Sequence, residues 1–141
     1  FRLVILLDTN VISALMRSQP DPVAIQWLDE QAAQTLWTTS VTVFEVRYGL
    51  RRLPEGRRQR DLLAAFDLVL TEDLQHRIAD FDAQAAEAAA ALAAGRDKAG
   101  RVIDLRDTMI AGIAIARRAA IATGNTRHFE GLPVRVVNPW G

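Results

Sequence analysis

The chain of 141 residues contains no cysteine, which excludes disulfide bonds and metal sites built on thiolates. It also lacks any run close to the roughly 20 apolar residues of a membrane span, and it shows no secretory leader pattern. These absences are compatible with a reducing compartment, so we expect a cytoplasmic protein that engages no membrane. Because the chain begins with Phe1 rather than Met, we also expect that a native first residue is missing.

An excess of charge of either sign is absent as well, since 17 basic residues balance 17 acidic ones. The chain is therefore not a polycation that binds nucleic acid through net charge alone. One local exception lies between positions 47 and 60, where six arginines accompany a single acid, Glu55. Such a run is more often a solvated helix face, although arginine also binds phosphates in a bidentate way. Phosphate binding becomes the better interpretation of this run only if the arginines lie near an acidic site.

Hydrophobic residues make up 50% of the chain, which suits one domain over residues 1–141. Short apolar runs alternate with segments of helical periodicity, and the latter include an alanine-rich stretch that favours a packed helix over a linker. This alternation predicts parallel βαβ units in a three-layer α/β/α sandwich with a short, mostly parallel sheet. We expect strands at 3–7, 35–39, 78–81, 119–123 and 134–137, helices at 10–17, 21–31, 40–53, 57–68, 83–94 and 105–119, and a turn at 95–100.

The most informative residue is Asp8, which follows the apolar run at 3–7 without any intervening polar residue. A fully apolar strand is typical of a parallel sheet that is buried on both faces. In open α/β sheets, ligands bind beyond the carboxyl ends of the strands. Asp8 is therefore predicted to lie where such a fold places its chemistry.

Two further acids interrupt apolar helices. Glu45 lies on the predicted helix face of Tyr48 and Arg52, so it is either a functional carboxylate or a partner of Arg52 or another base. Asp107 precedes a buried helical stretch, whereas Asp104, three residues earlier, fits the N-cap position of the same helix. Each of these features also has an ordinary structural explanation when taken alone.

Asn125 lies in a loop that follows the fourth predicted strand and returns to the edge of the sheet occupied by Asp8. Three carboxylates at one edge repel one another and stay ionised only when a cation binds between them. Hard oxygen ligands without His or Cys favour Mg²⁺ or Mn²⁺, which can activate water for attack on a phosphodiester. His76 and His128 have no ligand-spaced partner and are expected to be surface or loop residues. Acids near an arginine-rich helix thus indicate a nuclease.

Four segments resemble the PIN-domain ribonuclease toxins of type II toxin–antitoxin modules, the VapC family, and within it the FitB-like branch. The resemblance covers nearly the whole chain and depends on four motifs in order. These are LLDTNVIS at 6–13, VTVFEVRYGL at 41–50, the segment at 103–129 that contains DLRDTMIAG, and VVNPW at 136–140.

The resemblance implies a metal-dependent endoribonuclease with candidate catalytic residues Asp8, Glu45, Asp107 and Asn125. Asp8 and Asp107 would hold Mg²⁺ or Mn²⁺, and Glu45 would position or deprotonate the attacking water. Asn125 replaces the family's fourth acid, so a second metal should bind more weakly. Three neighbours would orient the acids: Thr9, Asn10 and Thr123.

Partners are also implied. Toxins of this family are typically homodimers, sometimes within larger complexes, and are inhibited by a VapB/FitA-like antitoxin that inserts an Arg among the carboxylates. RNA is the implied substrate, and DNA is bound only through the antitoxin.

Several other functions do not fit this sequence. A dehalogenase-like phosphatase needs a second Asp where Asn10 stands, a receiver domain needs adjacent acids and a late Lys, and a P-loop needs GxxxxGK[ST]. The remaining alternative is a PIN-like module that is catalytically weak or inactive because of Asn125 and mainly binds its antitoxin.

Overall fold

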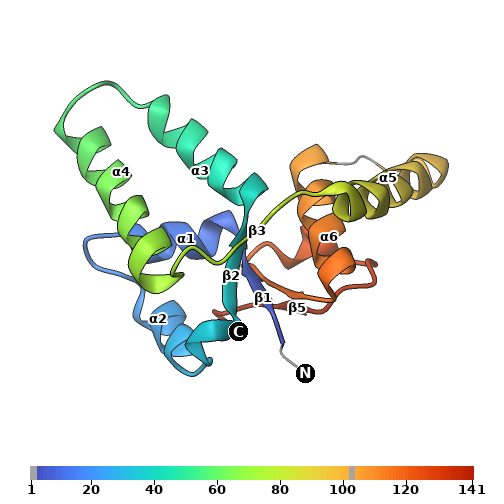
Figure 1. Ribbon diagram of the computed structural model, residues 1–141, viewed down its shortest axis with the longest axis horizontal. Coiled ribbons are helices and arrows are strands. Elements are labelled where there is room, and N and C mark those ends of the chain that lie inside the picture. Colours follow the sequence, from blue (N-terminus) through green and yellow to red (C-terminus); the bar gives the residue numbers. More distant parts are fainter. Residues whose placement is uncertain (1–2, 102–103) are drawn as a thin grey trace.

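The computed structural model describes residues 3–101 and 104–141, so Phe1 and Ile103 lie outside the described residues (Figure 1). Its centre is a five-stranded sheet in the order β3-β2-β1-β4-β5, and all four neighbouring pairs are parallel. This confirms the predicted α/β class with a short parallel sheet. The strands are β1 (Ile5–Leu7), β2 (Leu36–Thr39), β3 (Ile78–Ala79), β4 (Ala120–Ala122) and β5 (Val136–Val137).

The predicted helices are all present; α4 has the predicted bounds and the others have shifted ends. The longer ones are α1 (Thr9–Met16), α2 (Pro22–Asp29), α3 (Ser40–Arg51), α4 (Arg57–Leu68), α5 (Ala83–Lys98) and α6 (Leu105–Arg117). Three short turns of helix, none of them predicted, are η1 (Ala33–Thr35), the π-helical η2 (Val69–Asp73) and η3 (Thr126–Phe129).

The side chains of β1 alternate between two apolar clusters, one on each face of the sheet. Ile5 and Leu7 pack with α1, α2 and α4, whereas Leu6 packs with α5 and α6. Figure 1 shows the corresponding layers, with α1 to α4 on one side of the sheet and α5 and α6 on the other. Three-layer packing of this kind buries β1 completely and confirms the expected sandwich.

The turn predicted at 95–100 is wrong in its first part, because α5 continues through Gly95 to Lys98. Alanine has the highest helix propensity, and Arg96 and Lys98 in the last turn favour the negative end of the helix dipole. Gly100, at φ +70°, then ends the helix in a conformation that suits glycine.

Helices α5 and α6 approach each other unusually closely at Gly112. A Cβ atom added there would lie 2.5 Å from the carbonyl oxygen of Ala85 and 2.8 Å from the Cβ of Ala89. The alanines of α5 therefore allow close contact with the helix that carries Asp107 near its start. No helix among the described residues is long and apolar enough to cross a membrane.

Candidate active site

Asp8 is buried at the carboxyl end of β1 and also forms the N-cap of α1. Its Oδ1 accepts a hydrogen bond of 2.8 Å from the backbone N–H of Thr9, and the side chain is only 6% exposed. Its Oδ2 accepts a hydrogen bond of 2.8 Å from the hydroxyl of Thr123 at the end of β4. The cap explains why α1 begins one residue earlier than predicted.

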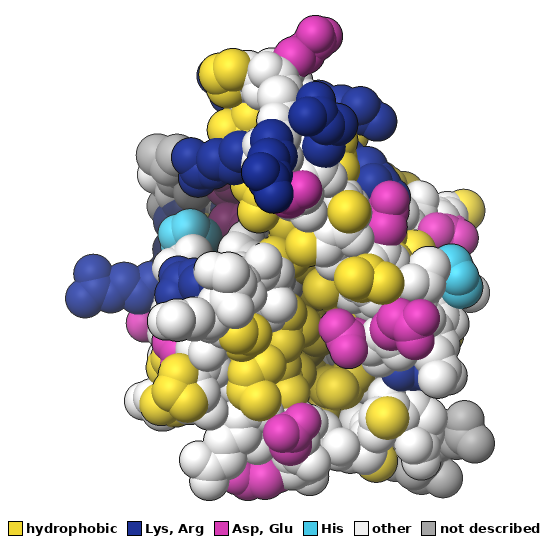
Figure 2. All heavy atoms as spheres, turned by 90° about the vertical axis from the view of Figure 1, so that its left-hand side faces the viewer, with side chains coloured by type: hydrophobic (Ala, Val, Ile, Leu, Met, Phe, Trp, Pro, Cys, Tyr) yellow, Lys and Arg dark blue, Asp and Glu magenta, His cyan; other side chains and the backbone are white. Residues whose placement is uncertain are grey.

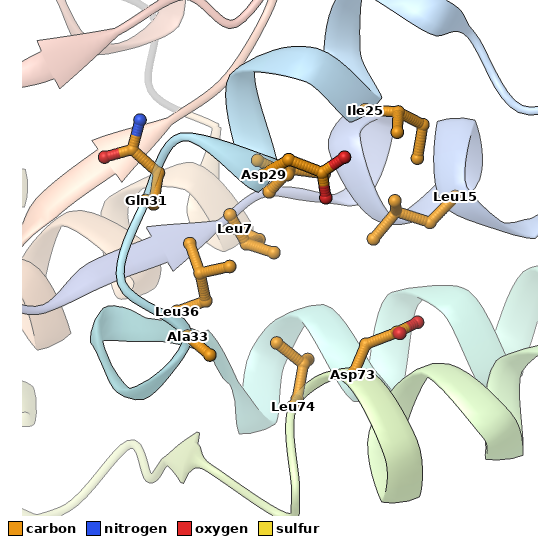
Figure 3. A pocket seen from close by; sticks show the side chains of 10 residues that line it. Leu7, Leu15, Ile25, Asp29, Gln31, Ala33, Leu36, Asp73 and Leu74 are labelled. Atoms are coloured by element: carbon orange, nitrogen blue, oxygen red, sulfur yellow. The ribbon is translucent and has the colours of Figure 1, made fainter.

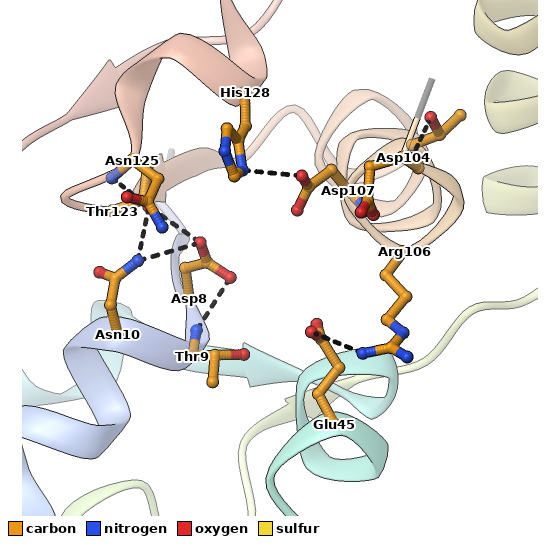
Figure 4. A network of polar contacts seen from close by, with 11 residues as sticks. Asp8, Thr9, Asn10, Glu45, Asp104, Arg106, Asp107, Thr123, Asn125 and His128 are labelled. Atoms are coloured by element: carbon orange, nitrogen blue, oxygen red, sulfur yellow. Dashed lines mark hydrogen bonds and ion pairs between the residues drawn. The ribbon is translucent and has the colours of Figure 1, made fainter. Parts of the chain in front are cut away.

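A polar network surrounds Asp8 on the β4 side (Figure 4). The amide nitrogen of Asn10 donates to the hydroxyl of Thr123 at 3.1 Å and reaches Asp8 Oδ2 at 3.5 Å. The same hydroxyl accepts the backbone N–H of Asn125 at 3.0 Å, and Gly124 donates its N–H to Asn10 Oδ1 at 2.9 Å. Five residues from the start of α1 and the end of β4 are thus held to one another, as an orienting role for Asn10 and Thr123 requires.

Glycine at position 124 fits its surroundings closely. A Cβ atom there would lie 3.2 Å from the ring of Trp140, whose indole N–H donates to Asp21 Oδ2 at 3.0 Å. The same Asp21 caps α2 through Val23 and Ala24, and its hydrogen bond from Trp140 is the main cause of its lowered pKa. The loop that carries Asn125 therefore packs against a tryptophan that is anchored elsewhere.

Glu45 projects from α3 toward the same edge of the sheet. Its Oε2 lies 3.6 Å from Nη1 of Arg106, so the basic partner is not Arg52, whose guanidinium lies over the ring of Tyr48. Partial burial raises the pKa of Glu45, the nearby charges of Asp8 and Asp107 raise it further, and Arg106 opposes both effects. Glu45 is therefore a stronger proton acceptor than an exposed glutamate.

Asp107 occupies the first turn of α6. Its backbone N–H donates to Oδ1 of Asp104 at 3.0 Å, which confirms the predicted N-cap role of Asp104. Burial, followed by the charges of Asp104 and Asp8, raises the pKa of Asp107 to about 6, although the neighbouring His128 opposes this shift.

His128 is a member of the site that the sequence did not reveal. It is exposed, as expected, and lies in the short helical turn η3, where its Nδ1 is 2.9 Å from Oδ2 of Asp107. The buried Phe129 anchors η3 and so determines which way His128 points. The sequence offers one signal for His128, which is its position shortly after the loop that follows β4. That signal does not identify Asp107 as the partner of His128. His76, by contrast, is exposed and stands apart from these residues.

The predicted residues come together around one cavity of about 310 Å³. Figure 4 shows carboxylates from the end of β1, from α3 and from α6 directed toward this space. Its lining consists of Asp8, Thr9, Asn10, Glu45, Asp104, Arg106, Asp107, Asn125 and His128.

The donor chemistry of this cavity suits a hydrated divalent cation. Across residues 3–101 and 104–141, no three His, Asp or Glu side chains are close enough together to hold one ion unaided. Mg²⁺, however, commonly binds through one or two carboxylates and retains several waters. Among the described residues the hydroxyl of Thr9, which belongs to the lining of this cavity, has no hydrogen-bond partner although it is buried, so a bound ion or its water would satisfy it.

A second cavity of about 310 Å³ lies at a different place, between α1, α2 and η2 (Figure 3). Its walls are mostly leucine and isoleucine, with Asp29 and Asp73 at the edge. Burial and the neighbouring Glu72 raise the pKa of Asp73. This cavity lacks the converging acids that hydrolytic chemistry needs.

Comparison with known proteins places these features in context. The family model described as the PIN domain matches residues 5–133. The VapC ribonuclease Y4jK of Sinorhizobium fredii is 36% identical over 97% of this chain and 98% of its own length. The toxin FitB of Neisseria gonorrhoeae is 32% identical over 97% of this chain and 99% of its own. A solved structure of FitAB bound to an IR36 DNA fragment superposes with a TM-score of 0.86 at 32% identity, covering 98% of this chain and 96% of that one.

Proposed function

Because this chain belongs to the PIN-domain family, we propose that it is the toxin of a type II toxin–antitoxin module and hydrolyses RNA as a metal-dependent endoribonuclease. The single observation that carries this proposal is the convergence of Asp8, Glu45 and Asp107 on one polar cavity. The relatives named as a VapC ribonuclease and as the toxin FitB support it, since each is similar over 97% of the chain.

We assign Asp8 and Asp107 as the residues that would hold Mg²⁺ or Mn²⁺. When bound, the ion supplies positive charge that polarises the scissile phosphate and lowers the pKa of a water molecule. Asp8 is suited to this role because Thr123 and the start of α1 fix its two oxygens. Asp107 currently faces His128, so a cation would compete with that imidazole for its Oδ2.

Glu45 is assigned to position the attacking water and accept its proton. Its raised pKa, due to burial and to Asp8, makes it a better proton acceptor than an exposed glutamate. Arg106 reaches the pocket from the opposite wall and holds the carboxylate at 3.6 Å. Asn125 would support the site as an uncharged oxygen donor, so one metal is expected to bind more tightly than a second.

The partner proposed for this chain is a VapB/FitA-like antitoxin that also carries the DNA-binding function. The FitAB structure with DNA is a precedent for such an assembly. An arginine from that partner would relieve the same repulsion among the carboxylates that a metal relieves. A toxin homodimer, alone or in a larger complex, remains part of the proposal.

The decisive experiment measures cleavage of a structured RNA with and without Mg²⁺ or Mn²⁺, using the wild type and Asp8→Asn. We expect cleavage by the wild type only with metal and none by the variant. Asp82→Asn is the matched control, because Asp82 caps α5 in the same chemical way but lies outside the cavity. Cleavage that survives both EDTA and Asp8→Asn would contradict the proposal, and absence of cleavage by the wild type would favour the inactive binding module.

A further inference from the structure

Two large aromatic side chains on α3 are exposed to solvent. Phe44 is 57% exposed and Tyr48 is 47% exposed. Their ring centroids are 5.9 Å apart with only 14° between the planes, so the rings present nearly parallel faces. The guanidinium of Arg52 lies 5.5 Å from the centroid of the Tyr48 ring.

These aromatic residues do not contribute to the core of the described residues. The buried apolar contacts of α3 come from Val41 and Val46 instead, and neither apolar cluster includes Phe44 or Tyr48. Each of these residues leaves about half of its surface exposed to solvent, and an exposed aromatic pair of this size suggests a function at the surface.

Their position relates them to the carboxylate cavity. Phe44 directly precedes Glu45, and Tyr48 follows Glu45 by three residues, which places it on the adjoining helical face. Phe44, Tyr48 and Arg52 are spaced four residues apart, so they form a row that runs along α3 from the level of Glu45 toward the α3–α4 turn.

Arginines accompany this row along the hairpin formed by α3 and α4. Figure 2 shows Lys and Arg side chains gathered over the α3–α4 hairpin. The exposed arginines there are Arg51, Arg52, Arg57, Arg58 and Arg60. A row of aromatic faces next to arginines is the combination that binds single-stranded nucleic acid, because bases stack on the rings while cations follow the backbone.

We propose that Phe44 and Tyr48 form a stacking platform for unpaired bases of the RNA next to the cleaved bond, with Arg52 beside them. The inference rests on the proposed nuclease function and deepens it, because it restricts the substrate to unpaired segments. A duplex hides the faces of its bases, whereas a loop or single strand can place them on the rings. Phe44 and Tyr48 are thus positioning residues rather than catalytic ones.

The test measures binding of an end-labelled single-stranded RNA, the same strand with abasic residues, and its duplex, all in the Asp8→Asn background. Two double variants are compared. F44L/Y48L removes both aromatic rings, whereas F44W/Y48F keeps an aromatic ring at each position. We expect F44L/Y48L to weaken binding of the intact strand about tenfold or more and to leave binding of the abasic strand unchanged. F44W/Y48F should bind like the parent protein.

In the cleaving protein, F44L/Y48L should raise KM with little change in kcat. Equal loss of affinity for the intact and abasic strands, or no loss for either, would overturn the inference. It would also be overturned if F44L/Y48L converted a dimer to monomers in analytical ultracentrifugation without weakening RNA binding, since the row would then be an interface between copies. If the wild type bound RNA with the expected base dependence but cleaved none, the platform would stand and the proposed catalysis would fail.

Discussion

Thr123 and Asp8 are joined by a hydrogen bond of 2.8 Å, although 115 positions separate them in the chain. The bond joins the ends of the neighbouring parallel strands β4 and β1, and both side chains are nearly inaccessible to solvent. The same hydroxyl accepts hydrogen bonds from Asn10 and Asn125. The hydroxyl group of Thr123 therefore links, by hydrogen bonds, the parts of the site that follow β1 and β4.

Replacement of Thr123 by valine preserves the shape but removes the hydroxyl. Asp8 Oδ2 then loses its shortest hydrogen bond and Asn125 N–H loses its acceptor, so we expect destabilisation of about 1–3 kcal/mol. Cleavage should fall roughly tenfold or more, because Asp8 then keeps only the hydrogen bond from Thr9 and the longer contact with Asn10, which hold its carboxylate less firmly. Urea unfolding and initial cleavage rates measure the two effects. Thr123→Ser should retain most of both properties, and an equal loss in the serine variant would contradict the role of the hydroxyl.

The raised pKa of Asp107 predicts a pH-dependent stability. Because its pKa rises from 3.8 to about 6, the folded protein retains this proton more readily than the unfolded chain. The resulting stabilisation is complete below pH 3.8 and is lost as the pH rises through about 6. Relative to the wild type, Asp107→Asn should therefore gain about 1–2 kcal/mol of stability between pH 4 and pH 7.5, with metal chelated throughout. Thermal unfolding of both proteins across this range provides the test, and a constant difference would refute it.

Asn125→Asp should strengthen the binding of a second metal ion. The substitution adds a charged oxygen to a cavity that already holds Asp8 and Asp107, while the backbone hydrogen bond from position 125 to Thr123 remains. Isothermal titration with Mn²⁺ measures stoichiometry and affinity. Asn138→Asp is the control, because Asn138 makes a similar local turn contact to Trp140 and lies outside the cavity. Unchanged binding in Asn125→Asp would contradict the prediction.

The arginines of the α3–α4 hairpin should differ in function according to their partners. Arg58 and Arg60 are exposed, whereas Arg47 forms a 2.8 Å ion pair with Asp67 and lies 5.0 Å from the ring centroid of Phe66. R58A/R60A should weaken RNA binding and reduce the salt dependence of log K by about 1 or more. Arg47→Ala should instead lower stability by about 1 kcal/mol with little change in the salt dependence. The reversed pattern would contradict the prediction, because it would show that Arg47 contacts RNA and that Arg58 and Arg60 do not.

The sequence was sufficient to predict the meeting of Asp8, Glu45 and Asp107, because hydrophobic patterning located the strands and helices and parallel topology brings their ends to one edge. It could not predict the ionic partners. Arg52 is the arginine on the helix face of Glu45, yet Arg106 reaches that carboxylate from another element. His128 was missed for the same reason, since its contact with Asp107 depends on the orientation of η3.

The length of α5 shows a different limit of sequence reasoning. Glycine at position 95 suggests a helix end, but the neighbouring alanines and the closing cations extend the helix to Lys98. Propensity summed over the whole segment outweighs one unfavourable residue. The outcome could have been anticipated only by weighing the complete window rather than its glycine.

The alanine-rich composition of α5 has a consequence for how this protein can evolve. Ala85 and Ala89 leave no space for larger groups at Gly112, so almost any enlargement at these three positions forces the two helices apart. Asp107 lies little more than one helical turn before Gly112 and would move with its helix. The low-complexity, alanine-rich sequence of α5 is therefore among the segments least tolerant of substitution. A mutational library should find more neutral changes around the exposed arginines than among these small residues.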